Sequence, residues 1–164
     1  MILFVAQGFG VGRIPFAPGT FGSVVGMLWM TLLLAIGSFW CYLAALFGSA
    51  ALSVWLCGEA ERILGKPDPG SVVLDEIVAI PLCFLAWILA HLQHSGSMPA
   101  PAEFLGGGGW AYTLATFVAF RFFDIAKPWP VHQSQRLPGG WGVTMDDLLA
   151  ALWVNLALFV FLPS

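Results

Sequence analysis

The stretch FRFFDIAKPWPVHQSQRLPGGWGVTMDD, residues 120–147, holds three of the chain's six basic residues and three of its nine acidic ones. Arg121, Asp124 and Lys127 follow one another at intervals of three, so a helix that ran on to Lys127 would place them near one another on one face. Pro128 predicts the end of that helix, because proline lacks an N–H donor and disfavours helical geometry in the residue before it.

A glycine-rich turn with Gly139, Gly140 and Gly142 comes next, and Asp146 and Asp147 open the following apolar segment. Carboxylates thus stand at the end of one predicted helix and the start of another, with basic residues between them. This combination suits a divalent cation together with a phosphate group.

The composition predicts an integral membrane protein. The chain is 59% hydrophobic and 9% charged, whereas soluble domains carry about 25% charged residues. A net charge of −3 gives no electrostatic footprint for nucleic acid. The N-terminus lacks the basic region of a cleaved signal peptide. We therefore expect one membrane-embedded domain, residues 1–164.

Apolar segments separated by polar or glycine-rich connections predict the fold class, an all-α integral membrane protein. We expect a compact bundle of about five short transmembrane or re-entrant helices, since a full span takes about 20 residues. The predicted helices cover residues 22–36, 39–57, 74–92, 110–124 and 146–162. Cys41, Cys57 and Cys83 all lie inside apolar runs without paired metal-ligand spacing, and they are interpreted as small buried hydrophobic residues.

Two further segments carry polar groups beside the predicted helices. Residues 7–23 are rich in glycine and proline and predict a loop or broken helix, with Thr20 and Ser23 as hydroxyl donors to a phosphate or as parts of a re-entrant turn. Asp75 and Glu76 open the third apolar segment. Two adjacent acids at the mouth of a membrane helix are costly unless they are paired, hydrated or bound to a cation. A helix N-cap role for Asp75 is the structural alternative.

The distribution of basic residues predicts the orientation. With the helices above, alternate connections lie on alternate sides, and all Lys and Arg residues then fall on one side. These residues are Arg13, Arg62, Lys66, Arg121, Lys127 and Arg136. The positive-inside rule makes this side cytoplasmic, and every polar group named above lies on it.

Four motifs in this chain resemble those of the phosphatidylglycerophosphatase A family: PFAPGTFGS at 15–23, LDEIV at 74–78, FRFFDIAKPWP at 120–130 and GGWGVTMDDLLA at 139–150. The resemblance implies a bacterial enzyme of the cytoplasmic (inner) membrane. Such an enzyme uses Mg²⁺ to hydrolyse phosphatidylglycerophosphate, a membrane phospholipid, to phosphatidylglycerol and phosphate. The family has an aromatic residue before the Asp-Glu pair, where this chain has Leu74.

A phosphatase of this kind would use oxygen ligands, because the chain has neither a Cys-x5-Arg loop nor an Asp-x-Asp haloacid-dehalogenase pattern. Our hypothesis assigns the metal ligands and one catalytic base to Asp75, Glu76, Asp124, Asp146 and Asp147. Contacts to the substrate phosphate are assigned to Thr20, Ser23, Arg121, Lys127 and, more weakly, Arg13. Attack by water and attack by an aspartate both remain open, as does the number of metal ions.

The alternative from another functional class is a small membrane transporter or channel with an acid-lined ion path. Against it, the polar residues cluster on one side, and none of the acids lies near the middle of an apolar segment. A synthase that uses a CDP-activated lipid is disfavoured, because its Asp-x-x-Asp-Gly-x-x-Ala-Arg pattern is absent. The sequence leaves the oligomeric state and the acyl-chain preference open.

Overall fold

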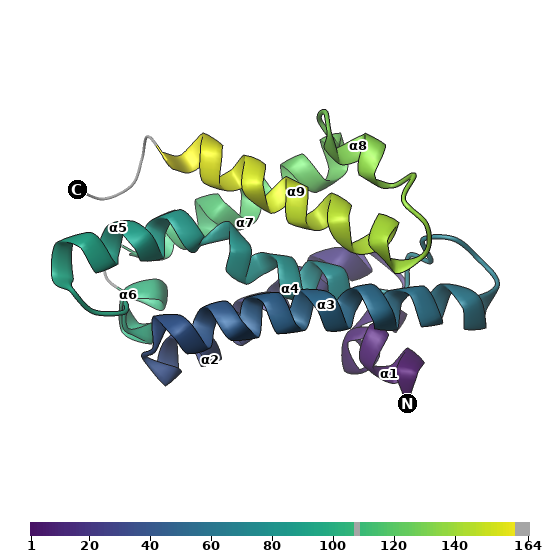
Figure 1. Cartoon of the computed structure of the whole chain (residues 1–164), viewed down its shortest axis with the longest axis horizontal. Helices are drawn as coiled ribbons and strands as arrows, with labels where there is room; N and C mark the ends of the chain where they lie inside the picture. Colours follow the sequence, from purple (N-terminus) through teal and green to yellow (C-terminus); the bar gives the residue numbers. More distant parts are fainter. Residues whose placement is uncertain (107–108, 160–164) are drawn as a thin grey trace.

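The structure is a computed structural model, and it describes residues 1–106 and 109–159. These residues form helices and no strand, which confirms the all-α prediction (Figure 1). The longer helices are α2 (Pro18–Ile36), α3 (Phe39–Leu64), α4 (Leu74–Cys83), α5 (Leu85–Ser95), α7 (Gly109–Ala126) and α9 (Gly140–Leu158). The short ones are α1 (Ile2–Ala6), the 3₁₀ helix η1 (Gly8–Arg13), α6 (Pro101–Leu105) and α8 (Val131–Ser134).

Helix α4 lies at the centre of the bundle and packs against α2, α3, α7 and α9. Eight of its ten residues are buried. Helix α2 approaches α4 through glycine: a Cβ at Gly22 would lie 2.8 Å from Cβ of Val73, the N-cap of α4, and one at Gly26 would lie 2.6 Å from Cγ1 of Ile80. Such close approach fixes the backbone of α2 beside the start of α4, where Asp75 and Glu76 stand.

The central helix is interrupted at Phe84, between α4 and α5, and the backbone groups around the interruption find side-chain partners. Pro81 lies inside α4, and its carbonyl accepts a hydrogen bond from the Tyr42 hydroxyl at 2.6 Å. Asn155 of α9 donates to the Leu82 carbonyl at 2.7 Å and accepts from the Ala86 N–H at 2.8 Å. An interrupted helix within an apolar bundle needs such partners, because no water replaces the lost backbone bonds.

The outer surface of the bundle is apolar. Val24, Leu28, Leu32 and Ile36 recur every four residues along α2, and all four are exposed. A stripe of this kind on a long helix is the reverse of the pattern in a soluble protein. Within the described residues, three stretches are long and apolar enough to cross a membrane: Pro18–Ile36, Phe39–Leu64 and Leu74–Ser95. The larger number of about five spans stays a prediction.

Several helix boundaries differ from those predicted. Helix α2 begins at Pro18, because proline is well suited to the first helical turn. Thr20 therefore lies in the same helix as Ser23, which the predicted helix 22–36 already included. Helix α3 continues through the charged residues after Cys57 and ends at Gly65, whose φ of +63° favours glycine. Helix α9 begins at Gly140, so part of the predicted glycine-rich turn is helical. A further short helix, α6, forms within the predicted loop at 93–109.

Candidate active site

Three carboxylates converge between the start of α4 and the second turn of α9. Asp75, Glu76 and Asp147 each offer an oxygen, and these oxygens all lie within 4.8 Å of one another. We call these three residues the acid cluster. Asp75 is 6% exposed and Asp147 is 3% exposed. One oxygen of each carboxylate is buried without a hydrogen-bond partner among the described residues: Oδ1 of Asp75, Oε2 of Glu76 and Oδ2 of Asp147.

A buried polar group without a hydrogen-bond partner costs about 2–7 kcal/mol of folding free energy. Buried, unpaired carboxylates are therefore destabilising unless a positive group compensates them. Hard divalent cations such as Mg²⁺ bind carboxylate oxygens. The donor set, its burial and its free oxygens therefore fit a divalent cation held by Asp75, Glu76 and Asp147.

Local structure explains how two neighbours in sequence reach the same point. Asp75 and Glu76 lie in the first turn of α4, where the positive end of the helix dipole favours carboxylates. The N-cap of α4 is Val73, so the alternative role of Asp75 as N-cap is wrong. Asp147 arrives from α9, which packs directly against α4.

Arg121 connects the acid cluster to the end of α7. Its Nη1 lies 2.8 Å from Oδ2 of Asp124 and 4.0 Å from Oε1 of Glu76. The same nitrogen donates to the hydroxyl oxygen of Ser23 at 3.4 Å. The Nε of Arg121 is buried and has no partner among the described residues. A guanidinium that faces one member of the acid cluster and keeps an unused donor is suited to an anion bound next to a cation.

Lys127 lies just beyond the end of α7 and pairs with Asp146 of α9. Its Nζ is also 3.9 Å from Oδ1 of Asp124. Gln135 donates to Oδ2 of Asp146 at 3.1 Å. Burial lowers the pKa of Lys127, but the hydrogen bond and charge of Asp146 outweigh it and leave the pKa raised above its ordinary value. Lys127 therefore carries a positive charge at neutral pH.

The predicted phosphate contacts on the N-terminal side have different surroundings. Ser23 donates to the Gly19 carbonyl at 2.9 Å and accepts from Arg121, so its oxygen belongs to the site. Thr20 is half-buried in the first turn of α2, and its side chain makes no hydrogen bond within the described chain. Arg13 is exposed in η1, donates to Oε1 of Gln7 at 3.0 Å and forms no ion pair among the described residues.

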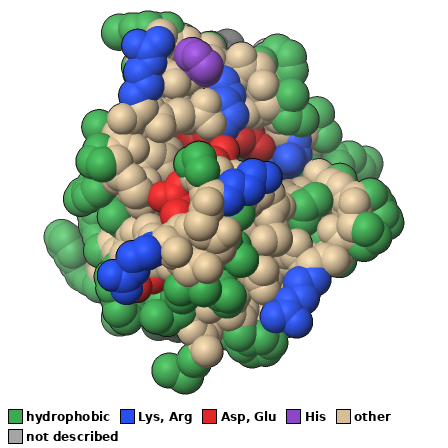
Figure 2. All heavy atoms as spheres, turned by 90° about the vertical axis from the view of Figure 1, so that its right-hand side faces the viewer, with side chains coloured by type: hydrophobic (Ala, Val, Ile, Leu, Met, Phe, Trp, Pro, Cys, Tyr) green, Lys and Arg blue, Asp and Glu red, His purple; other side chains and the backbone are tan. Residues whose placement is uncertain are grey.

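The structure thus places nine of the ten predicted site residues at the helix ends around the acid cluster or in the helix turn beside it. The tenth, Arg13, forms its hydrogen bond with Gln7 instead. Figure 2 shows this end of the molecule: acidic side chains lie near its middle, with Lys and Arg side chains around them. Asp124 and Asp146 belong to ion pairs with Arg121 and Lys127, whereas the acid cluster keeps free oxygens.

Two residues of the site were not identified from the sequence. A Cβ at Gly19 would collide with Oε1 of Glu76 and lie 3.2 Å from Nη1 of Arg121, so only glycine leaves room for both. The glycine-rich start of α2 was the available signal. Gln135 contacts Asp146 from a connecting segment, and no periodicity or spacing in the sequence singles it out.

Comparison with known proteins identifies relatives of this chain. It is 33% identical to phosphatidylglycerophosphatase A of Haemophilus influenzae over 96% of this chain and 86% of the relative, and 30% identical to phosphatidylglycerophosphatase A of Escherichia coli over 90% and 76%. A putative phosphatidylinositol-3-phosphatase of Bacteroides thetaiotaomicron is 33% identical over 92% and 87%. No solved structure gives a significant match. The sequence profile named phosphatidylglycerophosphatase A matches residues 4–162. This chain therefore belongs to the phosphatidylglycerophosphatase A family and is a lipid phosphatase.

Proposed function

We propose that this protein is a Mg²⁺-dependent phosphatase that hydrolyses phosphatidylglycerophosphate to phosphatidylglycerol and phosphate at the cytoplasmic face of the bacterial inner membrane. The observation that carries the proposal is the acid cluster, with three free, buried oxygens, next to Arg121, whose Nη1 lies 4.0 Å from Oε1 of Glu76 and whose Nε is unpaired among the described residues. A cation site next to a cationic group is what a phosphomonoester requires.

The residues divide into two groups by their contacts. Asp75, Glu76 and Asp147 hold the cation, which when bound orients the substrate and stabilises charge on the phosphoryl oxygens. Arg121 contacts the phosphate through the donor that the protein leaves free. Asp124 holds Arg121 in place through the 2.8 Å ion pair. Ser23 supports the same guanidinium from α2.

Lys127 and Asp146 form the outer part of the site. The ion pair between them neutralises Asp146 and places a positive charge 3.9 Å from Asp124. Lys127 thereby offsets part of the negative charge of the site, which would otherwise repel a doubly charged phosphate. Thr20 and Arg13 are weaker candidates for substrate contacts, since neither side chain contacts the acid cluster in the described structure.

The location follows from the distribution of charge. The basic residues lie in η1, at the C-terminal ends of α3 and α7 and in the segment after α8. The turns from α2 to α3 and from α5 to α6 carry no Lys or Arg. The positive-inside rule then orients the site toward the cytoplasm, at the level of the lipid headgroups. This asymmetry supports a one-sided enzyme over a transport path through the bundle.

A phosphatidylinositol phosphate is the second candidate substrate, because the name of the Bacteroides relative refers to such a lipid. Both lipids present a phosphomonoester at the end of a headgroup, so the acid cluster and Arg121 suit either. The headgroup remainder, glycerol or inositol, is what separates the two candidates.

The test is phosphate release from each lipid in detergent micelles, with Mg²⁺ and with EDTA. We expect release from phosphatidylglycerophosphate that requires Mg²⁺ and is lost in Asp75→Asn. Glu103→Gln serves as the matched control, since Glu103 is an exposed acid at the opposite end that pairs with His91. Folded wild-type protein that releases phosphate only from the inositol lipid would overturn the proposed substrate. Release that persists undiminished in EDTA would overturn the metal requirement.

A further inference from the structure

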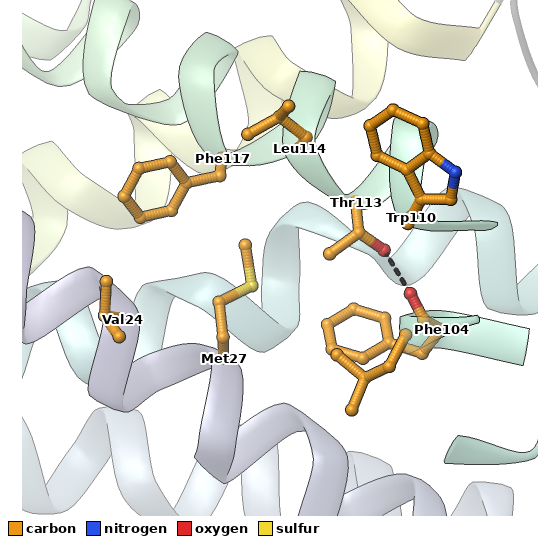
Figure 3. A pocket seen from close by; sticks show the side chains of 8 residues that line it. Val24, Met27, Phe104, Trp110, Thr113, Leu114 and Phe117 are labelled. Atoms are coloured by element: carbon orange, nitrogen blue, oxygen red, sulfur yellow. Dashed lines mark hydrogen bonds between the residues drawn. The ribbon is translucent and has the colours of Figure 1, made fainter. Parts of the chain in front are cut away.

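An apolar groove lies between α2 and α7, with α6 at its end (Figure 3). Val24 and Met27 line it from α2, Phe117, Leu114 and Trp110 line it from α7, and Phe104 lines it from α6. Its volume is about 300 Å³. Thr113 also lines the groove, but its hydroxyl donates to the Phe104 carbonyl at 2.7 Å. The surface that the groove presents is therefore almost wholly apolar.

The groove begins where the candidate active site ends. Val24 follows Ser23 in α2, and Phe117 lies one helical turn before Arg121 in α7. Arg121 and Ser23 are themselves joined across these two helices by the 3.4 Å hydrogen bond. A phosphate at Arg121 and a hydrocarbon chain in the groove would thus belong to neighbouring parts of one continuous surface.

The distance from Arg121 to the far end of the groove matches one leaflet of a bilayer. Eleven residues separate Arg121 from Trp110, which is about 16 Å of α-helix at a rise of about 1.5 Å per residue. The hydrocarbon core of a bilayer is about 30 Å thick, so one leaflet accounts for about 15 Å. A volume of about 300 Å³ is at the lower end of the range of about 300–1,000 Å³ for small-molecule pockets. This volume suits one acyl chain better than two.

We propose that the groove between α2 and α7 binds one acyl chain of the lipid whose phosphate is held at Arg121 and the acid cluster, so that substrate enters laterally between these two helices. This inference rests on the proposed function and adds the entry path and the chain-binding surface. The second acyl chain then stays in the surrounding bilayer.

Filling the groove tests this assignment. Leu114→Trp places a larger side chain in the groove, whereas Val118→Trp makes a similar change one turn away on the exposed face of α7, outside the groove lining. For a long-chain phosphatidylglycerophosphate we expect kcat/KM to fall about tenfold or more in Leu114→Trp, which corresponds to about 1.4 kcal/mol. For the deacylated headgroup, which has no chain to place, Leu114→Trp should match wild type. Val118→Trp should match wild type on both substrates.

A measurement on the wild-type protein avoids any effect of substitution on folding. A phosphatidylglycerophosphate with a photoreactive diazirine at the end of one acyl chain is irradiated with the protein in nanodiscs, and the labelled peptides are identified by mass spectrometry. We expect the label on the residues around Trp110 and Leu105, competed away by unlabelled substrate. A diazirine near the headgroup should instead label the Val24 and Phe117 region.

The outcomes distinguish a failure of the proposed function from a failure of the groove assignment alone. Wild-type protein that hydrolyses neither substrate overturns the proposed function and this inference with it. An active wild type, with Leu114→Trp equal to Val118→Trp on the long-chain lipid, overturns the groove alone. Label spread evenly over the exposed stripe of α2 and over α3 would also overturn it, since the occupant would then be bulk lipid.

Discussion

The Nη1 atom of Arg121 lies 2.8 Å from Oδ2 of Asp124, one turn further along α7. The same nitrogen faces Glu76 at 4.0 Å and Ser23 at 3.4 Å, so one guanidinium joins three segments that are far apart in sequence. Because Nη1 makes all three contacts, Nε of Arg121 keeps a buried donor without a partner among the described residues, and a lysine ammonium, a single point charge, has no equivalent of it.

Arg121→Lys is therefore expected to lower kcat/KM about 10- to 100-fold, since hydrogen bonds to charged groups contribute about 1.5–3 kcal/mol. Steady-state phosphate release measures the effect. Arg62→Lys is the matched control, because Arg62 forms an ion pair with Glu59 and is largely exposed. Near-wild-type kinetics for Arg121→Lys would mean that the guanidinium does not contact the phosphate.

We expect the substitution Asp147→Asn in the acid cluster to change thermal stability in opposite directions with and without metal. In EDTA, Asp147→Asn removes one of three mutually repelling, buried charges, so its thermal unfolding temperature should rise above that of wild type. With Mg²⁺ the order should reverse, because wild type gains RT ln(1 + [L]/Kd), about 2.7 kcal/mol at 100 times Kd, and the variant gains little. Thermal unfolding in detergent, with and without Mg²⁺, checks both signs.

Glu103→Gln should show the wild-type response to Mg²⁺, since Glu103 lies outside the acid cluster. An Asp147→Asn variant that Mg²⁺ stabilises as strongly as wild type would remove Asp147 from the ligand set.

Gly19 has a steric role that its neighbours do not share. An added methyl group would push against Oε1 of Glu76 and Nη1 of Arg121 at the same time. Since a displacement of about 1 Å at a catalytic group costs on the order of 100-fold in rate, Gly19→Ala should lose about that much activity. Gly48→Ala is the control: nothing lies within 4 Å of its Cβ position. That variant should keep full activity and gain about 0.5–1 kcal/mol in helix stability. Equal activity in the two variants would contradict the steric argument.

The pairing of Lys127 with Asp146 predicts a stability effect that a second substitution rescues. Lys127→Met leaves the buried Asp146 charge with the Gln135 amide and the Asp147 backbone N–H but no cation, and it should cost about 1–3 kcal/mol, the usual penalty for a buried polar group that loses a partner. In Lys127→Met/Asp146→Asn that charge is absent, so most of the loss should be recovered. Thermal unfolding of wild type, both single variants and the double variant gives the stabilities needed for a double-mutant cycle. Additive losses would show that the two side chains do not interact.

The sequence predicted the helical class and the residues of the site better than it predicted the local structure around them. Arg121, Asp124 and Lys127 could be grouped by their spacing alone, because a helix repeats regularly. The convergence of Asp147 on Asp75 depends on the packing of α9 against α4, which no local pattern records. The helical state of Thr20 was missed because glycine and proline usually favour loops, whereas here the glycines of α2 allow tight packing on α4. Tertiary contact outweighed local preference at that point.

The proposed orientation makes a prediction about chemical accessibility. Lys66 lies after α3 at the basic end, and Ser97 lies in the exposed turn between α5 and α6. In a Cys41→Ser background, which removes the exposed native thiol and keeps the buried Cys57 and Cys83, each position is replaced by cysteine. A membrane-impermeant maleimide applied to intact cells with a permeabilised outer membrane should label Ser97→Cys and leave Lys66→Cys unlabelled. Disruption of the inner membrane should expose Lys66→Cys, which serves as the control for reactivity. Labelling of Lys66→Cys in intact cells would place the acid cluster on the outer face, where cytoplasmic Mg²⁺ and newly made lipid phosphate would not reach it directly.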